Sequence, residues 1–127
     1  MLRLIYTSQV SESITPDDIE HIISAARDYN SRVAISGLLI SNFHYFFQVL
    51  EGPDLLVRLL YSKIENDPRH SQINFISESE VTSRLFPDWT MGYLVFPTED
   101  PPVINDDWTK LTSAESDKVL EKVLLNR

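Results

Sequence analysis

The sequence predicts an α+β domain of the ferredoxin-like class, in the order β-α-β-β-α-β-β with two helices on one face of a mixed sheet. Two observations carry this prediction along the 127 residues: two segments have apolar residues at helical spacing, and five segments are rich in residues that favour strands. A chain of this length buries a single core. We therefore expect one packed domain followed by a helical tail.

The first strand is predicted for residues 2 to 8, where the even-numbered residues from Leu2 to Ser8 share one face because side chains alternate along a strand. The first helix begins after Thr15, a hydroxyl cap, with Pro16 at its first position and two carboxylates in its first turn. Its expected end is near Asn30, because asparagine tolerates the left-handed conformation that ends many helices.

Two strands are predicted next, at residues 33 to 40 and 45 to 51, joined by a short hairpin connection at residues 41 to 44. Both are apolar on successive residues, which indicates a central pair buried on both faces. Gly52-Pro53-Asp54 opens a second helix that ends at Asn66-Asp67-Pro68. Its expected apolar stripe consists of Leu55, Leu56, Leu59, Leu60 and Ile64.

The last two strands are predicted for residues 72 to 81 and 89 to 96, separated by a turn at Phe86-Pro87-Asp88. A linker from Phe96 to Pro102 follows, and then an amphipathic helix over residues 113 to 125. We expect this tail, or a second subunit, to cover the sheet face that the two helices leave open. The predicted division is a domain at residues 1–96 and a linker with a C-terminal helical tail at residues 97–127.

Composition excludes several classes of function. The net charge is -8, from 11 basic and 19 acidic residues, so the protein would repel a phosphate backbone and we expect no direct nucleic-acid binding. The chain has no cysteine, which excludes disulfides and thiolate metal ligands. It shows neither a signal peptide nor a membrane-spanning run. We expect a cytoplasmic protein with no membrane contact.

Known catalytic patterns are missing. The three glycines match no phosphate-binding loop, and the three histidines do not cluster at the spacing of metal ligands.

Polar residues in apolar surroundings stand out instead. Gln48 interrupts an apolar strand, and a buried amide left unpaired costs about 1 to 3 kcal/mol. Tyr6 could bond it if their strands are neighbours, and Asn30 could add a second amide to the same layer.

Structural roles are the alternative for each of these residues. Asn30 would then cap its helix, Gln48 would satisfy backbone groups, and Tyr6 would be a core residue. Trp89 and Met91, two apart on one face of the last predicted strand, would be ordinary core packing.

Several segments together resemble BLUF domains, small flavin photoreceptor domains, over residues 2 to 94. No single segment is specific for the family, but the segments together, in this order and at this spacing, are a specific signal. The segments are Arg3-Leu4-Ile5-Tyr6-Thr7-Ser8, Asn30 with Ile35-Ser36-Gly37-Leu38-Leu39, Phe46-Phe47-Gln48-Val49-Leu50-Glu51-Gly52, Asp67-Pro68-Arg69-His70, and Phe86-Pro87-Asp88-Trp89-Thr90-Met91.

The resemblance implies a blue-light photoreceptor that binds FAD noncovalently, with the flavin ring between the two helices. Tyr6 then corresponds to the electron and proton donor, Gln48 to the switching amide, and Asn30 to the residue that holds the ring edge. Trp89 and Met91 are the expected signal relay. The further residues expected to contact the flavin are Ile22, Ile64, Lys63, Asp67, Arg69 and His70. Lys63 and Tyr29 depart from the family's pattern, which affects only the secondary ring contacts.

The resemblance describes a sensor and not an enzyme, and we expect the signal to pass to a separate effector protein or through a homo-oligomer. Two other classes of function stay open. One is a small hydrolase of the acylphosphatase kind, for which the sequence offers no anion-binding loop. The other is a plain protein-interaction module in which Tyr6 and Gln48 are structural. Flavin absorption in the purified protein separates the photoreceptor from both.

Overall fold

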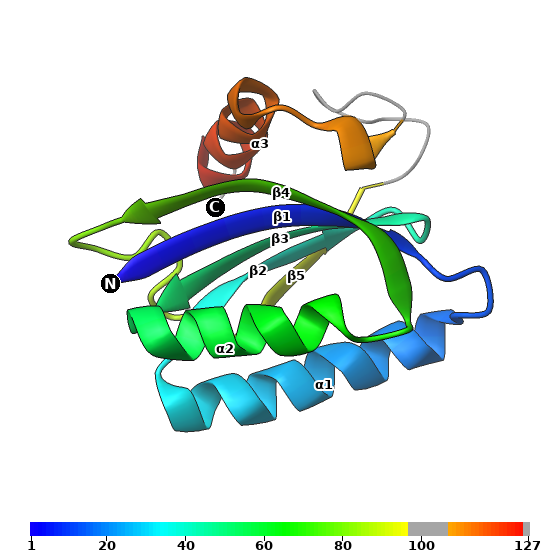
Figure 1. Cartoon of the computed structure of the whole chain (residues 1–127), viewed down its shortest axis with the longest axis horizontal. Helices are drawn as coiled ribbons and strands as arrows, with labels where there is room; N and C mark the ends of the chain where they lie inside the picture. Colours follow the sequence, from blue (N-terminus) through cyan, green and yellow to red (C-terminus); the bar gives the residue numbers. More distant parts are fainter. Residues whose placement is uncertain (97–106, 126–127) are drawn as a thin grey trace.

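The structure, a computed structural model, describes residues 1–96 and 107–125, in which five strands form one mixed sheet. Their order along the chain confirms the predicted fold class (Figure 1). The elements are β1 (Leu2–Val10), α1 (Pro16–Val33), β2 (Ser36–Ser41), β3 (Tyr45–Gly52), α2 (Asp54–Glu65), β4 (His70–Glu80), β5 (Gly92–Val95), the short 3-10 helix η1 (Trp108–Lys110) and α3 (Ser113–Leu125). The predicted linker lies outside the described residues, apart from Phe96.

The strands lie in the order β4-β1-β3-β2-β5, and all neighbours are antiparallel except β5, which runs parallel to β2. Tyr6 of β1 stands opposite Gln48 of β3, and Gln48 stands opposite Leu39 of β2. Residues directly opposite one another on neighbouring strands point to the same face of a sheet. Tyr6, Gln48 and Leu39 therefore share one face near the middle of the sheet.

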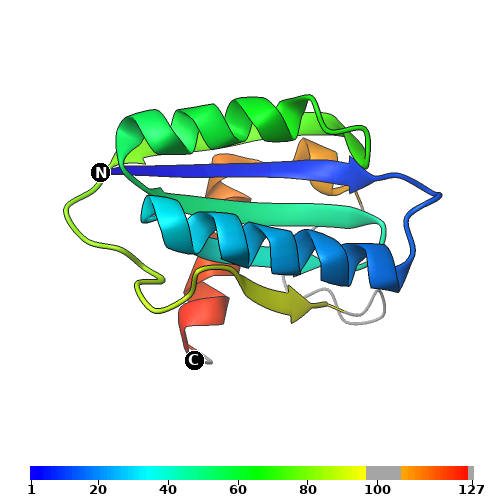
Figure 2. The same ribbon diagram turned by 90° about the horizontal axis from the view of Figure 1, so that it is seen from below.

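Helices cover both faces of this sheet. α1 and α2 lie on one face, which is the near face in Figure 2, and α3 lies on the other. The buried apolar residues accordingly form two clusters, one around Leu4 and Tyr6 on the side of α1 and α2, and one around Trp108 and Val119 on the side of α3. Of the two expected covers of the second sheet face, the helical tail and a second subunit, the structure has the helical tail there.

α1 begins as predicted but ends one turn later. Thr15 accepts a hydrogen bond from the backbone N–H of Asp18 (3.2 Å), and the Asp18 carboxylate accepts one from the Thr15 N–H (2.9 Å). The prediction that Asn30 takes the left-handed conformation at the helix end is wrong, because Ala34 takes it, with φ 59°. The chain turns at Ala34, and the next residue, Ile35, becomes buried in the core. This burial offsets the roughly 1–2 kcal/mol that a non-glycine residue costs in the left-handed conformation. Asn30 stays inside the helix.

α2 has the predicted bounds but a different buried face. Val57 is fully buried, whereas Leu55 and Leu59 of the predicted stripe are 68% and 50% exposed. The five apolar residues of that stripe span too wide an arc for one contact face, and the helix turns Leu56, Leu60 and Ile64 toward the sheet instead. None of the helices in the described part of the chain is long and apolar enough to cross a bilayer.

The last strand is shorter than predicted. Only Gly92–Val95 pairs with β2, and residues 81 to 91 before it form neither helix nor strand. Trp89 and Met91 therefore do not share a strand face: Met91 packs with the cluster under α1 and α2, and Trp89 with the cluster under α3. A backbone hydrogen bond from the Gly37 N–H to the Trp89 carbonyl (2.9 Å) ties this segment to the edge of β2.

Replacing Trp108 tests whether the tail docks on the sheet. Its ring is 2% exposed and stacks on Tyr45, so Trp108→Ala should lower the free energy of unfolding by about 3–5 kcal/mol. Urea unfolding followed by circular dichroism measures this. The control Leu125→Ala removes a side chain that is 79% exposed and should change stability by less than about 0.5 kcal/mol. A loss below about 1 kcal/mol for Trp108→Ala would contradict the docked tail.

Candidate functional site

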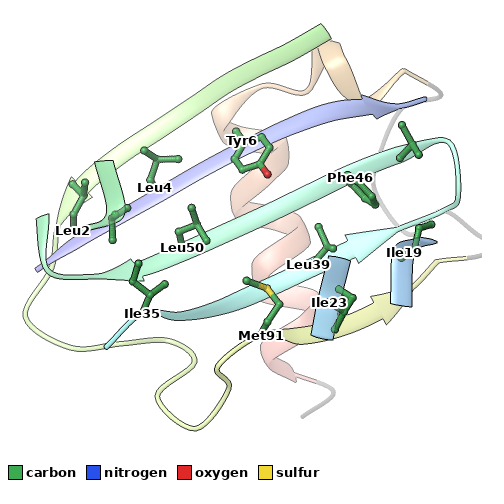
Figure 3. Packing of buried hydrophobic residues seen from close by; sticks show 12 residues of the cluster. Leu2, Leu4, Tyr6, Ile19, Ile23, Ile35, Leu39, Phe46, Leu50 and Met91 are labelled. Carbon is green, nitrogen blue, oxygen red and sulfur yellow. The ribbon is translucent and has the colours of Figure 1, made fainter. Parts of the chain in front are cut away.

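A cavity of about 350 Å³ lies between α1, α2 and the sheet. This volume is within the roughly 300–1,000 Å³ of ordinary ligand pockets, and its walls are mainly apolar with a few polar groups. Figure 3 shows the packing beneath it, where Tyr6, Phe46 and Leu39 stand on three neighbouring strands. The lining residues are Tyr6, Ile22, Ile23, Ala25, Ala26, Tyr29, Asn30, Leu39, Phe46, Gln48, Leu60, Lys63, Ile64, Asp67, Arg69, His70 and Met91.

Three side chains in the cavity wall form a hydrogen-bonded row. The Tyr6 hydroxyl donates a short hydrogen bond to Gln48 Oε1, and Gln48 Nε2 donates to the Met91 sulfur at 3.6 Å. Tyr6 and Gln48 are only 2% and 7% exposed. A thioether accepts only weakly, so the amide nitrogen is held far less firmly than the amide oxygen. A change at the Tyr6 hydroxyl could therefore turn the Gln48 amide and exchange its donor and acceptor.

Asn30 is a buried amide that is half satisfied. It lies in the last turn of α1, and its Nδ2 donates to the Thr90 carbonyl at 2.7 Å. A carbonyl can only accept, so the amide orientation is fixed and Oδ1 is left over. Among the described residues Oδ1 has no hydrogen-bond partner, although Asn30 is 1% exposed and lines the cavity. An unpaired buried acceptor costs about 1–3 kcal/mol, which a ligand N–H in the cavity would recover.

Burial controls the protonation of Tyr6. Removal of its phenol from water, with the Tyr61 ring 5.4 Å away between centroids, raises the pKa of Tyr6 well above its ordinary value. The phenol is therefore neutral across the physiological pH range. Loss of the proton alone would leave a negative charge in this apolar site. The phenol can therefore give up its proton readily only when an electron leaves the ring as well, because no net charge is then left behind.

Charged groups stand at the rim of the cavity. The Lys63 ammonium of α2 lies 4.9 Å from the centre of the Tyr29 ring of α1, a cation–π contact that joins the two helices. Asp67 and Arg69 form an ion pair at 2.5 Å, and the hydrogen bond from Arg69 holds the pKa of the Asp67 carboxyl below its usual range. The rim thus presents the Lys63 ammonium and the Asp67–Arg69 ion pair to the polar part of a ligand.

His70 closes the cavity beside Tyr6. Its Nε2 lies 2.6 Å from the Ile64 carbonyl, which can only accept, so Nε2 carries a proton. Its Nδ1 lies 2.7 Å from the Ser8 hydroxyl. These two bonds fix the imidazole between α2 and β1, where its ring lies 6.3 Å from that of Tyr6. His70 thereby holds the end of α2 against the strand that carries Tyr6.

The cavity brings together the flavin-contact residues that the sequence suggested, and Met91 with them. They are Tyr6, Ile22, Asn30, Gln48, Lys63, Ile64, Asp67, Arg69, His70 and Met91. Trp89 is not among the lining residues, because it stacks on Phe86 at 5.4 Å on the opposite side of the sheet. The expected shared face of Trp89 and Met91 is thus wrong, since the chain before β5 is not extended.

Sequence reasoning did not assign Ala25, Ala26, Leu39, Phe46 or Leu60 to the site, although all of them line the cavity. Ala25 and Ala26 carry a usable signal, because two adjacent small side chains in a helix leave space beside it. Leu39 and Phe46 carry none, since an apolar residue on a central strand is ordinary core. Only the strand register shows that they flank Gln48 and Tyr6.

A family model described as sensors of blue-light using FAD matches residues 1–92. The photoactivated adenylate cyclase subunit beta of Euglena gracilis is 33% identical over 91 residues, which are 70% of this chain and 11% of that protein. The blue light- and temperature-regulated antirepressor BluF of Escherichia coli (strain K12) is 39% identical over 73 residues, 58% of this chain and 18% of that protein. The chain thus spans a small part of the length of these relatives.

Solved structures match this chain over a larger share of its length than these relatives do. BlsA in its ground state has a TM-score of 0.87 at 28% identity, covering 98% of this chain and 87% of that chain. BlrB, described as a BLUF protein in its dark state, has a TM-score of 0.84 at 28% identity, covering 99% and 96%. Klebsiella pneumoniae BlrP1 with FMN and cyclic diGMP has a TM-score of 0.70 at 35% identity, covering 75% and 26%.

The raised pKa of Tyr6 predicts how stability depends on pH. A phenol whose pKa is higher in the folded chain contributes stability that is complete below its unfolded pKa, about 10, and is lost as the pH rises further. The free energy of unfolding should therefore fall above about pH 10, and less steeply in Tyr6→Phe. Urea unfolding of both proteins between about pH 8 and pH 11 measures the two slopes. Equal slopes would contradict the burial of a neutral phenol.

Proposed function

This chain belongs to the BLUF family, the sensors of blue light using FAD, and we propose that Tyr6 and Gln48 form its light-driven switch. Blue-light sensing with FAD as chromophore is the function of the family. The observation that supports the switch is the hydrogen bond from the Tyr6 hydroxyl to Gln48 Oε1 in the wall of the cavity.

The residues of the cavity fit a flavin ring. Ile22 of α1 and Ile64 of α2 line it from different helices and would pack against the ring, while Asn30 Oδ1 would accept from a ring N–H. Lys63 and Arg69 at the rim would hold polar parts of the cofactor. When bound, the flavin supplies absorption of blue light and, once excited, strong oxidising power.

Tyr6 is placed to give up an electron and its proton together. Loss of an electron makes the phenol O–H acidic, and Gln48 Oε1 is the acceptor that this O–H already contacts. Gln48 could take this proton on its oxygen and release another from its nitrogen toward a bound flavin, because an amide has both a donor and an acceptor. The acceptor for the electron and for the relayed proton would be the flavin. When the electron and proton return to Tyr6, the Gln48 side chain is left in a changed arrangement. Its new hydrogen bonds would shift the absorption to the red.

The amide change would leave the site through Met91 and Trp89. Turning Gln48 alters the contact of its Nε2 with the Met91 sulfur, directly before β5. The Met91 carbonyl accepts from Arg27 at 2.9 Å, so α1 is connected to the same point. Trp89, two residues earlier, packs on the side of α3. The segment thus connects the flavin side of the sheet with the tail side.

We propose further that the signal passes to a separate effector protein or through a homo-oligomer. The relatives include a photoactivated adenylate cyclase subunit and an antirepressor, of which this chain spans only 11% and 18%. We propose residues 1–96 as the sensor and residues 97–127 as linker and tail, since the family match ends at residue 92. We also propose that the chain acts in the cytoplasm.

The two other classes of function have weaker support. A hydrolase of the acylphosphatase kind needs an anion-binding loop with an arginine, and the sequence offers no such loop. A plain interaction module gives no reason for an unpaired buried amide oxygen that faces a ligand-sized cavity.

The absorption spectrum before and after blue light tests the switch. The parent protein should bind flavin and shift to the red, whereas Tyr6→Phe should bind flavin and show less than about a tenth of the shift, since packing survives and the phenolic donor is gone. Tyr61→Phe is the matched control, because it removes the neighbouring phenol, and it should shift normally. A normal shift in Tyr6→Phe would remove Tyr6 from the mechanism, and a colourless parent that takes up no flavin would contradict the photoreceptor.

Hydrogen exchange tests the route of output. Light should change the protection of Gly92–Val95 and Ser113–Leu125 in the parent, and Met91→Ala should reduce that change by about tenfold while keeping the red shift. Met91→Leu keeps the volume but removes the sulfur, and so separates packing from hydrogen bonding. If light leaves both regions of the parent unchanged, output leaves through another surface.

A further inference from the structure

Glu51 is a buried carboxylate that takes no part in the switch as proposed above. It lies on β3 three residues after Gln48 and is 0% exposed. Its oxygens accept from the backbone N–H of Leu85 at 2.9 and 3.0 Å, and from that of Phe86 at 2.9 Å. The Arg3 guanidinium donates to it at 2.9 Å. A carboxylate withdrawn from water to this degree is costly unless such partners surround it.

A second anchor stands beside the first. The Arg84 guanidinium donates to the Ser36 hydroxyl at 2.7 Å, to the Glu51 carbonyl at 3.1 Å and to the Ala34 carbonyl at 2.6 Å. Charge-assisted bonds of this kind are stronger than neutral ones. Residues 84 to 86 are thus bound to the ends of β2 and β3 although they belong to neither helix nor strand.

The anchored segment passes from one side of the sheet to the other. Phe86 packs on the α3 side, where it stacks on Trp89 at 5.4 Å. The Thr90 carbonyl and the Met91 sulfur then accept from Asn30 and Gln48 on the flavin side. Because side chains alternate along a strand, Glu51 points away from the face on which Gln48 lies. One strand therefore holds both ends of this segment, through Gln48 on one face and Glu51 on the other.

We propose that Glu51 is a positioning residue of the light switch: its carboxylate fixes the start of segment 85–91 on β3 and thereby sets Met91 against the Gln48 amide. This inference rests on the proposed switch, in which the contact between Gln48 and Met91 changes with light. A segment held at its start has few positions for Met91, which favours one arrangement of the amide in the dark and slows the exchange between arrangements.

The variant Glu51→Gln tests the proposal, since it keeps the size of the side chain but puts an N–H donor against two backbone donors and Arg3. In the dark, amide exchange at Leu85 and Phe86 should rise by about tenfold. Flavin binding and the size of the red shift should persist, and dark recovery should be about tenfold faster because the loosened segment no longer holds Met91. The matched control Glu78→Gln loses an exposed ion pair with Arg58 and should leave exchange and recovery unchanged.

Each other outcome overturns a definite part of the proposal. Unchanged exchange at Leu85 and Phe86 would show that Glu51 does not anchor the segment. Raised exchange with unchanged recovery would make Glu51 structural only. If Glu51→Gln does not fold, Arg84→Lys loosens the same anchor more mildly by removing the forked donor, and it should speed recovery in the same direction. A red shift in Tyr6→Phe would refute the switch itself while leaving the dark exchange result as a separate test of the anchor.

Discussion

Strand register places the Tyr6 phenol directly opposite the Gln48 amide, and this buried pair is the constraint on which the site depends. Two polar side chains buried away from bulk solvent need hydrogen-bond partners within the protein. The phenol therefore donates to the amide oxygen, and the amide nitrogen donates to the weak acceptor that remains, the Met91 sulfur. Burial also keeps the phenol neutral. The pair is therefore held by a direct hydrogen bond, which the loss of one electron from Tyr6 would disturb in the proposed switch.

The two helices on the flavin side leave a space that the chain's own side chains do not fill. α1 contributes small residues and the unpaired Asn30 oxygen, and α2 contributes Ile64 and Lys63. The connection after α2 contributes Asp67 and Arg69 to the polar rim. A cavity with apolar walls, one free acceptor and a switchable amide suits a planar ring with polar edges. A ligand N–H in the cavity would recover the cost of the unsatisfied oxygen.

The segment before β5 gives the flavin side a mechanical connection to the tail. Asn30 and Gln48 hold its end under α1, while Glu51 and Arg84 hold its start near the α3 side. Trp89 and Met91 consequently lie on opposite faces, two residues apart. We propose that a small movement at the Gln48 amide reaches both faces of the sheet, because a segment fixed at two points has little freedom to absorb it locally.

The sequence by itself determined the order of elements, the start of α1 at Thr15, the start of α2 after Pro53 and the prominence of Gln48, because caps, proline and apolar periodicity act over a few residues. It did not determine that α1 ends at Ala34, that Leu55 and Leu59 of α2 face outward, or that Trp89 and Met91 separate. Those features depend on partners distant in the chain: the core that takes Ile35, the sheet that α2 covers, and the carboxylate of Glu51. Only the tertiary structure brings such partners together, and it alone decided that Asn30 faces a cavity and does not cap its helix.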